Sequence, residues 1–202
     1  MSGKSKMKQG IYTVIFMVVI TAICVAGVSW LHHKSLKKIT MNNDMFAREA
    51  VLEAAGLLPK NRVNAEDISD IFQKNVIEKK LDDKVLYILK NGNYVIPVIG
   101  IGLWGKIYGV VGLENNLKIL TGVSFIKNEE TPGLGARITE KWFCRQFNGK
   151  EGPMTFIAEG TKGNDREFDG ITGATITTRA VQEMVNRTLI DAPGIVREVN
   201  DG

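Results

Sequence analysis

The stretch VLYILKNGNYVIPVIGIGLWGKIYGVVGLENNLKILTGVSFI, residues 85–126, decides the fold. Four runs rich in β-branched and aromatic residues predict strands at Val85–Leu89, Tyr94–Ile101, Ile107–Leu113 and Leu117–Ile126. They are separated by short turns at Asn91-Gly92-Asn93, at the glycine-rich corner Gly100–Gly105, and at Glu114-Asn115-Asn116. Parallel neighbours need a long crossover, whereas short turns join antiparallel strands. The stretch therefore predicts an antiparallel sheet.

Helical patterns flank this sheet on both sides. Residues from Asp44 to Leu58 are strong helix formers that end before Pro59, and Glu66–Leu81 has an apolar stripe, so both segments predict helices. Beyond the sheet we expect a helix at Thr139–Phe147, a strand at Met154–Ala158 and a final helix from about Thr177 to Ile190. The expected fold class is α+β, an antiparallel sheet with packed helices, in a domain of residues 44–202.

An apolar run of 21 residues, 11–31, contains no charged side chain. At about 1.5 Å per residue it would span about 30 Å, the thickness of a hydrocarbon core. Tyr12 and Trp30 fall near its ends, where aromatic rings prefer the membrane interface. The run exceeds a typical signal-peptide core and no small-x-small cleavage site follows it. We expect one transmembrane anchor, with residues 1–10 in the cytoplasm and residues 32–43 as a linker.

The positive charge is concentrated around this run. Residues 1–40 hold six lysines and no acidic residue, which leaves 20 basic against 22 acidic residues in the rest of a chain whose net charge is +4. Basic flanks suit lipid headgroups, whereas a nucleic-acid-binding domain would carry the excess itself. Three lysines lie on each side of the run, so the count of positive charges used by the positive-inside rule is equal on the two sides. The free amino terminus adds one positive charge to the N-terminal side, which weakly favours a cytoplasmic N-terminus and an external domain.

The residues that usually carry catalysis or bind metals are sparse. Cys24 lies in the apolar run and Cys144 in the soluble domain, so no disulfide is expected. His32 and His33 flank the membrane, which leaves no metal-ligand set and no Ser-His-acid triad. A Rossmann glycine motif between strand and helix and a P-loop lysine are both missing. We expect no catalytic residue and no metal site.

The segment DGITGATIT, residues 169–177, precedes the last predicted helix. The first turn of a helix offers free N–H groups and the positive end of the helix dipole, which favour a phosphate. Gly173 allows close approach of the backbone, and threonine hydroxyls lie at the same place. On these features alone the segment is also explained as an ordinary helix cap, since Thr and Asp commonly begin helices.

The pattern Asp-x-x-Thr-Gly-Ala-Thr, Asp169 to Thr175, resembles the flavinylation motif of FMN-binding subunits of the Rnf and sodium-pumping NADH:quinone reductase complexes. FDGITGATITTRAVQEMV is especially similar to the G subunit of the Rnf complex. The resemblance implies FMN bound covalently to Thr175 through a phosphoester, installed by a flavin transferase that takes FMN from FAD and recognises Asp169. It also makes Thr172, Gly173 and Ala174 part of the cofactor site.

A second stretch, ETPGLG at residues 130–135, follows the fourth predicted strand. By itself it predicts a turn, because proline and glycine favour turn conformations. The same hexapeptide recurs in this family about forty residues before the flavinylation motif, as here. The resemblance implies a loop that faces the flavin, with Glu130, Thr131, Leu134 and Gly135 as further cofactor-site residues. Trp142, Gln146 and Phe147 also match the family and are interpreted as packing residues.

The resulting expectation is a membrane-anchored electron-transfer subunit of an ion-translocating Rnf-type complex, with its domain on the extracytoplasmic side. Its partners would be other membrane subunits, the flavin transferase during maturation and the lipid bilayer, but no nucleic acid. GIGLWGKIYGVV, residues 100–111, is closer to the C subunit of the quinone reductase, which is one alternative. Trp104 in that segment either stacks near the flavin or lies elsewhere in the core or on the surface. A cofactor-free tethered scaffold, with TGAT as a helix cap, is the alternative from another class.

Overall fold

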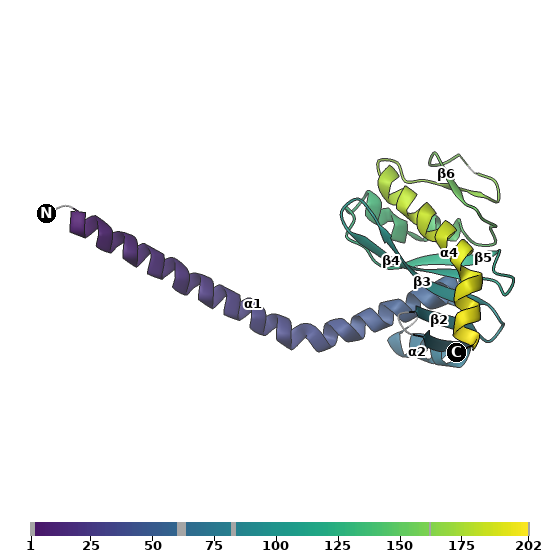
Figure 1. The fold of residues 1–202 in the computed structure, drawn as a ribbon, viewed down its shortest axis with the longest axis horizontal. Coiled ribbons are helices and arrows are strands. Elements are labelled where there is room, and N and C mark those ends of the chain that lie inside the picture. The colour runs from purple at the N-terminus through teal and green to yellow at the C-terminus, as the bar shows by residue number, and fades with distance from the viewer. Residues whose placement is uncertain (1–2, 60–63, 82–83, 162, 202) are drawn as a thin grey trace. The chain divides into compact units, whose positions relative to one another are not determined.

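The computed structural model describes residues 3–59, 64–81, 84–161 and 163–201. The chain divides into two compact units, residues 1–43 and residues 44–202. Helix α1 (Gly3–Ala54) begins in the first unit and ends in the second (Figure 1). In the first unit, Gln9–Leu36 is long and apolar enough to cross a membrane. Residues 32–43, expected to be a linker, continue the helix, so no helix begins at Asp44.

The end of α1 is set by Gly56 and not by Pro59. Gly56 has a φ of +70°, a left-handed conformation that glycine adopts without steric cost. Its N–H donates to the carbonyl of Glu53 at 3.0 Å, and the N–H of Leu57 donates to the carbonyl of Leu52 at 2.8 Å. This pair of bonds is the Schellman motif, which satisfies carbonyls that would otherwise lack a partner at a helix end.

The predicted antiparallel sheet is confirmed. Five strands lie in sequence order and each pairs with the next, namely β1 (Val76–Leu81), β2 (Lys84–Leu89), β3 (Tyr94–Ile101), β4 (Lys106–Leu113) and β5 (Leu120–Lys127). β5 begins three residues later than expected because Leu117 has a φ of +58° and its N–H closes a turn on Glu114. Asn116 accepts hydrogen bonds from the N–H groups of the two residues after Leu117, which lengthens that turn.

The predicted helix Glu66–Leu81 is wrong in its last six residues, 76–81. Helix α2 (Ala65–Asn75) ends before β1, whose first residue, Val76, pairs with Leu89. Val76 lies one helical turn after the buried Phe72, so it extends the apolar stripe whether the backbone is helical or extended. Hairpin pairing with β2 decides for the strand, because it supplies hydrogen bonds along the whole of β1.

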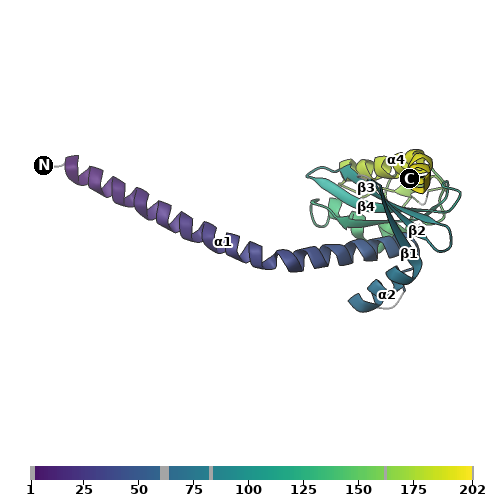
Figure 2. The same cartoon turned by 60° about the horizontal axis from the view of Figure 1, so that its bottom comes forward.

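The sheet is covered on both faces (Figure 2). Helix α4 (Thr175–Asp201) packs on one face, where its Val181 and Met184 join Ile96 and Val111 in a core. The end of α1 and helix α2 pack on the other face, against the alternate strand residues Val95, Val110 and Leu89. Because successive side chains of β3 and β4 point to opposite faces of the sheet, these strands contribute residues to the hydrophobic cores on both faces.

The remaining elements lie between β5 and α4. They are the 3₁₀ helix η1 (Gly135–Thr139), the short helix α3 (Lys141–Arg145) and the parallel strands β6 (Thr155–Ile157) and β7 (Glu167–Asp169). The helix expected at Thr139–Phe147 is the shorter α3, and η1 precedes it in a stretch for which no helix is expected. The strand expected at Met154–Ala158 is β6, whereas β7 is not among the predicted strands. Phe143, Phe147 and Phe168 are fully buried and hold this region on the sheet.

Candidate functional site

The turn before α4 presents Thr175 at its end. Gly173 has a φ of +79°, and the N–H of Ala174 closes the turn on the carbonyl of Ile171 at 3.0 Å. The N–H of Thr178 then makes the first helical bond, to the carbonyl of Ala174 at 2.9 Å. The N–H groups of residues 175–177 precede that bond and so have no intrahelical acceptor. Thr175 is exposed as the first residue of the helix.

The threonines around this turn have two different roles. Thr177 and Thr178 are buried, and the hydroxyl of Thr178 accepts from the N–H of Ile171 at 3.1 Å while donating to the carbonyl of Ala174 at 3.0 Å. These two bonds fix the turn against the helix. Thr172 and Thr175 are exposed. Thr175 is thus a hydroxyl available to a reagent at the helix N-terminus, as the motif predicts.

Asp169, the last residue of β7, lies where two loops meet. Its Oδ2 accepts from the N–H of Gly160 at 2.7 Å, whereas its buried Oδ1 has no hydrogen-bond partner among the described residues. The amide of Gln146 bonds both the N–H and the carbonyl of Asp169, at 2.7 and 3.1 Å. Gln146, interpreted from sequence as a packing residue, therefore fixes the backbone of the motif's aspartate.

Glu130 links three segments of the site from inside. The residue is only 6% exposed. Oε1 accepts from the N–H of Trp104 at 3.0 Å, and Oε2 accepts from the hydroxyl of Thr177. Burial raises the pKa of Glu130, but hydrogen bonding from Thr177 and from the backbone of residues 103–105 together lowers it by more, so the pKa lies below its usual value and the carboxylate is ionised. The β3–β4 turn, the ETPGLG loop and α4 are thereby joined.

Two glycines make room for this carboxylate. A Cβ at Gly102 would lie 2.4 Å from Oε1 of Glu130, and a Cβ at Gly135 would lie 2.7 Å from Oε2. A side chain at either position would therefore displace the carboxylate. Gly135, predicted as a cofactor-site residue, is buried and accommodates Glu130 from within the protein.

The structure brings the two sequence motifs side by side. Leu134 is 44% exposed, and a Cβ at Gly173 would lie 3.1 Å from its Cδ2. The carbonyl of Thr131 accepts from the N–H groups of Leu134 and Ala136, both at 3.1 Å, which closes the loop. Leu134 therefore lies over the turn that leads to Thr175. Thr131 takes part in closing the loop through its backbone carbonyl. Trp104 is 68% exposed on the adjoining β3–β4 turn.

An ion pair that no motif indicated completes the site. Glu159 accepts from the N–H of Thr172 at 2.8 Å, and two guanidinium nitrogens of Arg137 donate to its carboxylate at 2.8 and 3.4 Å. The bonds from Arg137 and Thr172 lower the pKa of Glu159 to about 2. Glu159, Thr172 and Thr175 line one hollow, together with Phe156 and its neighbours. The pair joins residues 22 positions apart, so local sequence gives no signal for it.

These groups fit an FMN phosphate at Thr175. The hydroxyl supplies an ester oxygen, the three N–H groups of the first turn supply donors, and Gly173 gives the turn before them its positive φ. Asp169 Oδ1 is a buried acceptor near the turn that lacks a donor among the described residues. The N–H donors suit a phosphate, and the carboxylate acceptor suits a hydroxyl group of the molecule that carries the phosphate.

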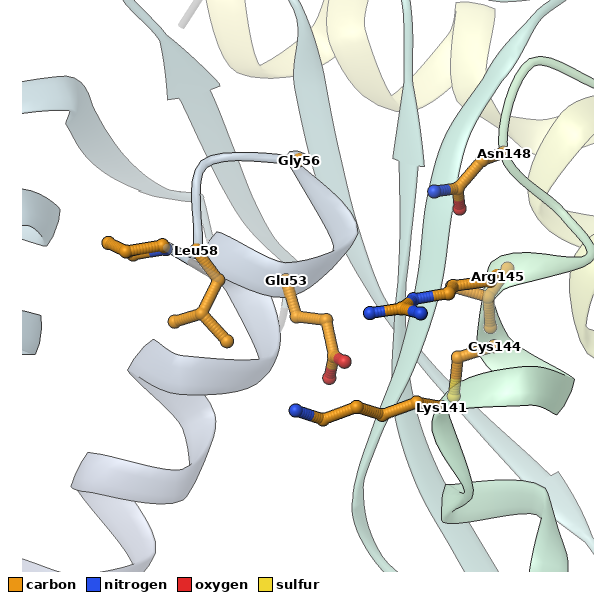
Figure 3. Close-up of a pocket in the computed structure, with 9 residues that line it drawn as sticks. Glu53, Gly56, Leu58, Lys141, Cys144, Arg145 and Asn148 are labelled. Carbon is orange, nitrogen blue, oxygen red and sulfur yellow. The ribbon is translucent and has the colours of Figure 1, made fainter. Parts of the chain in front are cut away.

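A second hollow lies elsewhere on the domain (Figure 3). Glu53 of α1 lines one side of it, and Lys141 and Arg145 of α3 extend towards that carboxylate from the other. The thiol of Cys144 lies in its wall; burial raises the pKa of this thiol to about 12. The hollow shares no lining residue with the one at Thr175. It is separate from the candidate site.

Comparison with known proteins agrees with this assignment. Residues 102–190 match the FMN-binding domain family. The chain is 28% identical over 186 residues to the G subunit of the Na⁺-translocating ferredoxin:NAD⁺ oxidoreductase complex of Acetobacterium woodii, covering 87% of each chain. It is 32% identical over 121 residues to the C subunit of the Na⁺-translocating NADH-quinone reductase of Vibrio campbellii, covering 54% of this chain and 46% of that one. The chain thus spans about half the length of the quinone-reductase relatives that it matches.

Solved structures share the fold. The crystal structure of the quinone-reductase C subunit from Parabacteroides distasonis superposes with a TM-score of 0.67 at 21% identity, covering 80% of this chain and 96% of that one. Shewanella oneidensis NqrC gives 0.63 at 22% identity, with coverage of 73% and 92%. Residues 102–190 are thus similar to the FMN-binding domain family, and the chain is similar to the G subunit of the ferredoxin:NAD⁺ oxidoreductase complex and to the C subunit of the NADH-quinone reductase.

Proposed function

We propose that this chain is an electron-transfer subunit of a membrane-bound, ion-translocating Rnf-type complex and carries FMN esterified to Thr175. One observation carries the proposal: within an FMN-binding domain, the threonine of the flavinylation motif is exposed at the first residue of α4, where the N–H groups lack intrahelical acceptors. If the motif were only a helix cap, its threonine side chains would be expected to bond to the turn. The hydroxyl of Thr178 makes such bonds, so a capping role does not account for the exposed threonine at position 175.

Attachment uses groups that the turn presents. The hydroxyl oxygen of Thr175 would form a bond to the phosphorus of the FMN half of FAD as the pyrophosphate bridge breaks, with AMP as the leaving group and release of the hydroxyl proton. The first-turn N–H groups and the helix dipole would hold the single negative charge of the phosphodiester. A transferase would supply the catalysis, and Asp169, the aspartate of the motif, is held beside the turn by the Gly160 N–H. Once bound, FMN supplies the electron-transfer chemistry.

The chain's own residues position the attachment site. Glu130 holds α4, the ETPGLG loop and the β3–β4 turn in one arrangement. Leu134 places an apolar, exposed surface beside the turn, and Trp104 adds another on the adjoining turn. A covalent link keeps the cofactor on this surface while the subunit exchanges electrons with its neighbours.

Helix α1 supports a membrane location. Gln9–Leu36 has the length and composition of a single membrane span, and the relatives named above are subunits of Na⁺-translocating complexes. We therefore propose that α1 anchors the chain in the bilayer beside other membrane subunits, with the FMN domain on the extracytoplasmic side.

The test compares Thr175→Ala with Thr175→Ser after co-expression with a flavin transferase. The wild-type chain should gain the mass of FMN minus water on a peptide containing Thr175, and its denatured band should fluoresce under ultraviolet light. Thr175→Ser retains a hydroxyl and should still be labelled, whereas Thr175→Ala should not. Labelled Thr175→Ala would contradict the attachment site, and an unlabelled wild-type chain would favour the cofactor-free scaffold.

The C subunit of the quinone reductase is the second candidate, because those relatives reach 32% identity. Coverage favours the G subunit, since that relative aligns with 87% of both chains while the quinone-reductase relatives align over about half of their length. Purifying the assembled complex and testing whether it reduces NAD⁺ with ferredoxin, or quinone with NADH, separates the two.

A further inference from the structure

The hollow beside Thr175 contains a charge that an incoming phosphate would oppose. Glu159 and Thr175 line the same hollow, and Glu159 is held there by the N–H of Thr172 at 2.8 Å. A phosphodiester on Thr175 carries one negative charge. Two like charges sharing a small hollow repel, and the repulsion would slow the attachment of the phosphate. The site therefore needs a cation to compensate Glu159.

Arg137 is the cation that the structure provides. It makes two hydrogen bonds to the carboxylate of Glu159, at 2.8 and 3.4 Å, in the forked geometry that guanidinium groups favour. The side chains of this pair are each 26% exposed. Arg137 does not itself line the hollow that contains Thr175, so its contacts reach the attachment site through Glu159.

Arg137 is in turn fixed by two further residues. Its guanidinium lies over the ring of Trp142, 5.3 Å from the centroid, and Nε lies 3.5 Å from a carboxylate oxygen of Glu140. Stacking and ion pairing restrict a long side chain that would otherwise sample many rotamers. This gives Trp142, interpreted from sequence as a packing residue, a role beyond packing: it orients the guanidinium.

We propose that Arg137 is a positioning residue for flavin attachment, which neutralises Glu159 and keeps it bound to the Thr172 N–H so that the hollow accepts the FMN phosphate. The proposal rests on the proposed covalent FMN at Thr175. It assigns to Arg137 an effect that acts through a carboxylate, and this distinguishes it from a direct phosphate ligand.

The experiment measures the initial rate of flavin attachment to the full-length chain in detergent, with purified transferase and FAD, by in-gel fluorescence and intact mass. Arg137→Ala should be slower by about fivefold, the factor that corresponds to one charge interaction a few ångströms apart in water. Arg137→Ala/Glu159→Gln should recover to within about twofold of the wild-type rate, because the uncompensated charge is gone. Since the interaction is between charges, the defect of Arg137→Ala should also shrink in about 0.5 M salt.

Matched variants separate this effect from damage to the fold. Arg145→Ala removes an equal charge from the separate hollow shown in Figure 3, and FMN should be attached to this variant at the wild-type rate. Arg137→Lys retains the charge and should be faster than Arg137→Ala. If Arg137→Ala simply misfolded, Glu159→Gln would not rescue it. The proposal is overturned if Arg137→Ala reacts at the wild-type rate or if the double variant is as slow as Arg137→Ala. Failure of the wild-type chain to be labelled would instead overturn the proposed function.

Discussion

Replacing Glu130 by alanine should destabilise the domain far more than the loss of an exposed carboxylate. The substitution removes both acceptors that serve Thr177 and Trp104, while the hydroxyl of Thr177 stays in a residue only 1% exposed. An unsatisfied buried donor costs about 1–3 kcal/mol, and the partly buried N–H of Trp104 adds about 1 kcal/mol. The expected total is about 3 kcal/mol, which corresponds to a fall in Tm of about 6–12 °C for a domain of this size.

Urea unfolding of the full chain in mild detergent, followed by tryptophan fluorescence, measures this difference. Glu129→Ala is the matched control, because Glu129 is the neighbouring, less buried carboxylate and its loss should change stability by less than about 0.5 kcal/mol. In a Thr177→Val background, one of the two unsatisfied groups is already absent, so Glu130→Ala should cost about 1–2 kcal/mol less. A cost below about 1 kcal/mol for Glu130→Ala, or full additivity with Thr177→Val, would refute the reasoning.

Three further changes test separate features of the domain. Gly173→Ala should lower the free energy of unfolding by about 1–2 kcal/mol, since the position has a φ of +79°; an unchanged urea midpoint would contradict this. In a Cys24→Ser chain at pH 8, Cys144 should not react with a thiol reagent before unfolding, because burial raises its pKa to about 12; prompt labelling of the folded chain would contradict it. Hydrogen bonding to Arg137 lowers the pKa of Glu159 to about 2, so the stability difference between wild type and Glu159→Gln should be complete above about pH 4.3 and vanish as the pH falls towards 2; thermal unfolding across that range checks it.

The sheet was predictable because each strand pairs with its sequence neighbour. The expected Tyr94–Ile101 is β3 as the structure has it, and short turns fixed the antiparallel order. β1 was missed because Val76 continues the apolar stripe of α2, so the choice between helix and strand depends on pairing with β2. β7 has only three residues and no distinctive pattern.

The candidate site likewise has a part that could be predicted from the sequence and a part that could not. The motif residues from Asp169 to Thr175 follow one another along the chain, so the sequence places them together at the start of a helix. The buried bond between Glu130 and Thr177 joins positions 47 residues apart. The pair of Arg137 and Glu159 joins η1 to the turn after β6. Such contacts depend on how the elements pack, and composition or periodicity carries no information about them.

The order of the strands has a consequence for how the protein is made. β1 to β5 can pair one after another as the nascent chain lengthens, because every partner is the preceding strand. The turn before α4 is different, since Glu130 can bind the hydroxyl of Thr177 only after α4 has been synthesised and has packed on β3. The sheet strands therefore leave the ribosome before Thr175 is presented, so the turn before α4 takes its final form only in chains whose core is already complete.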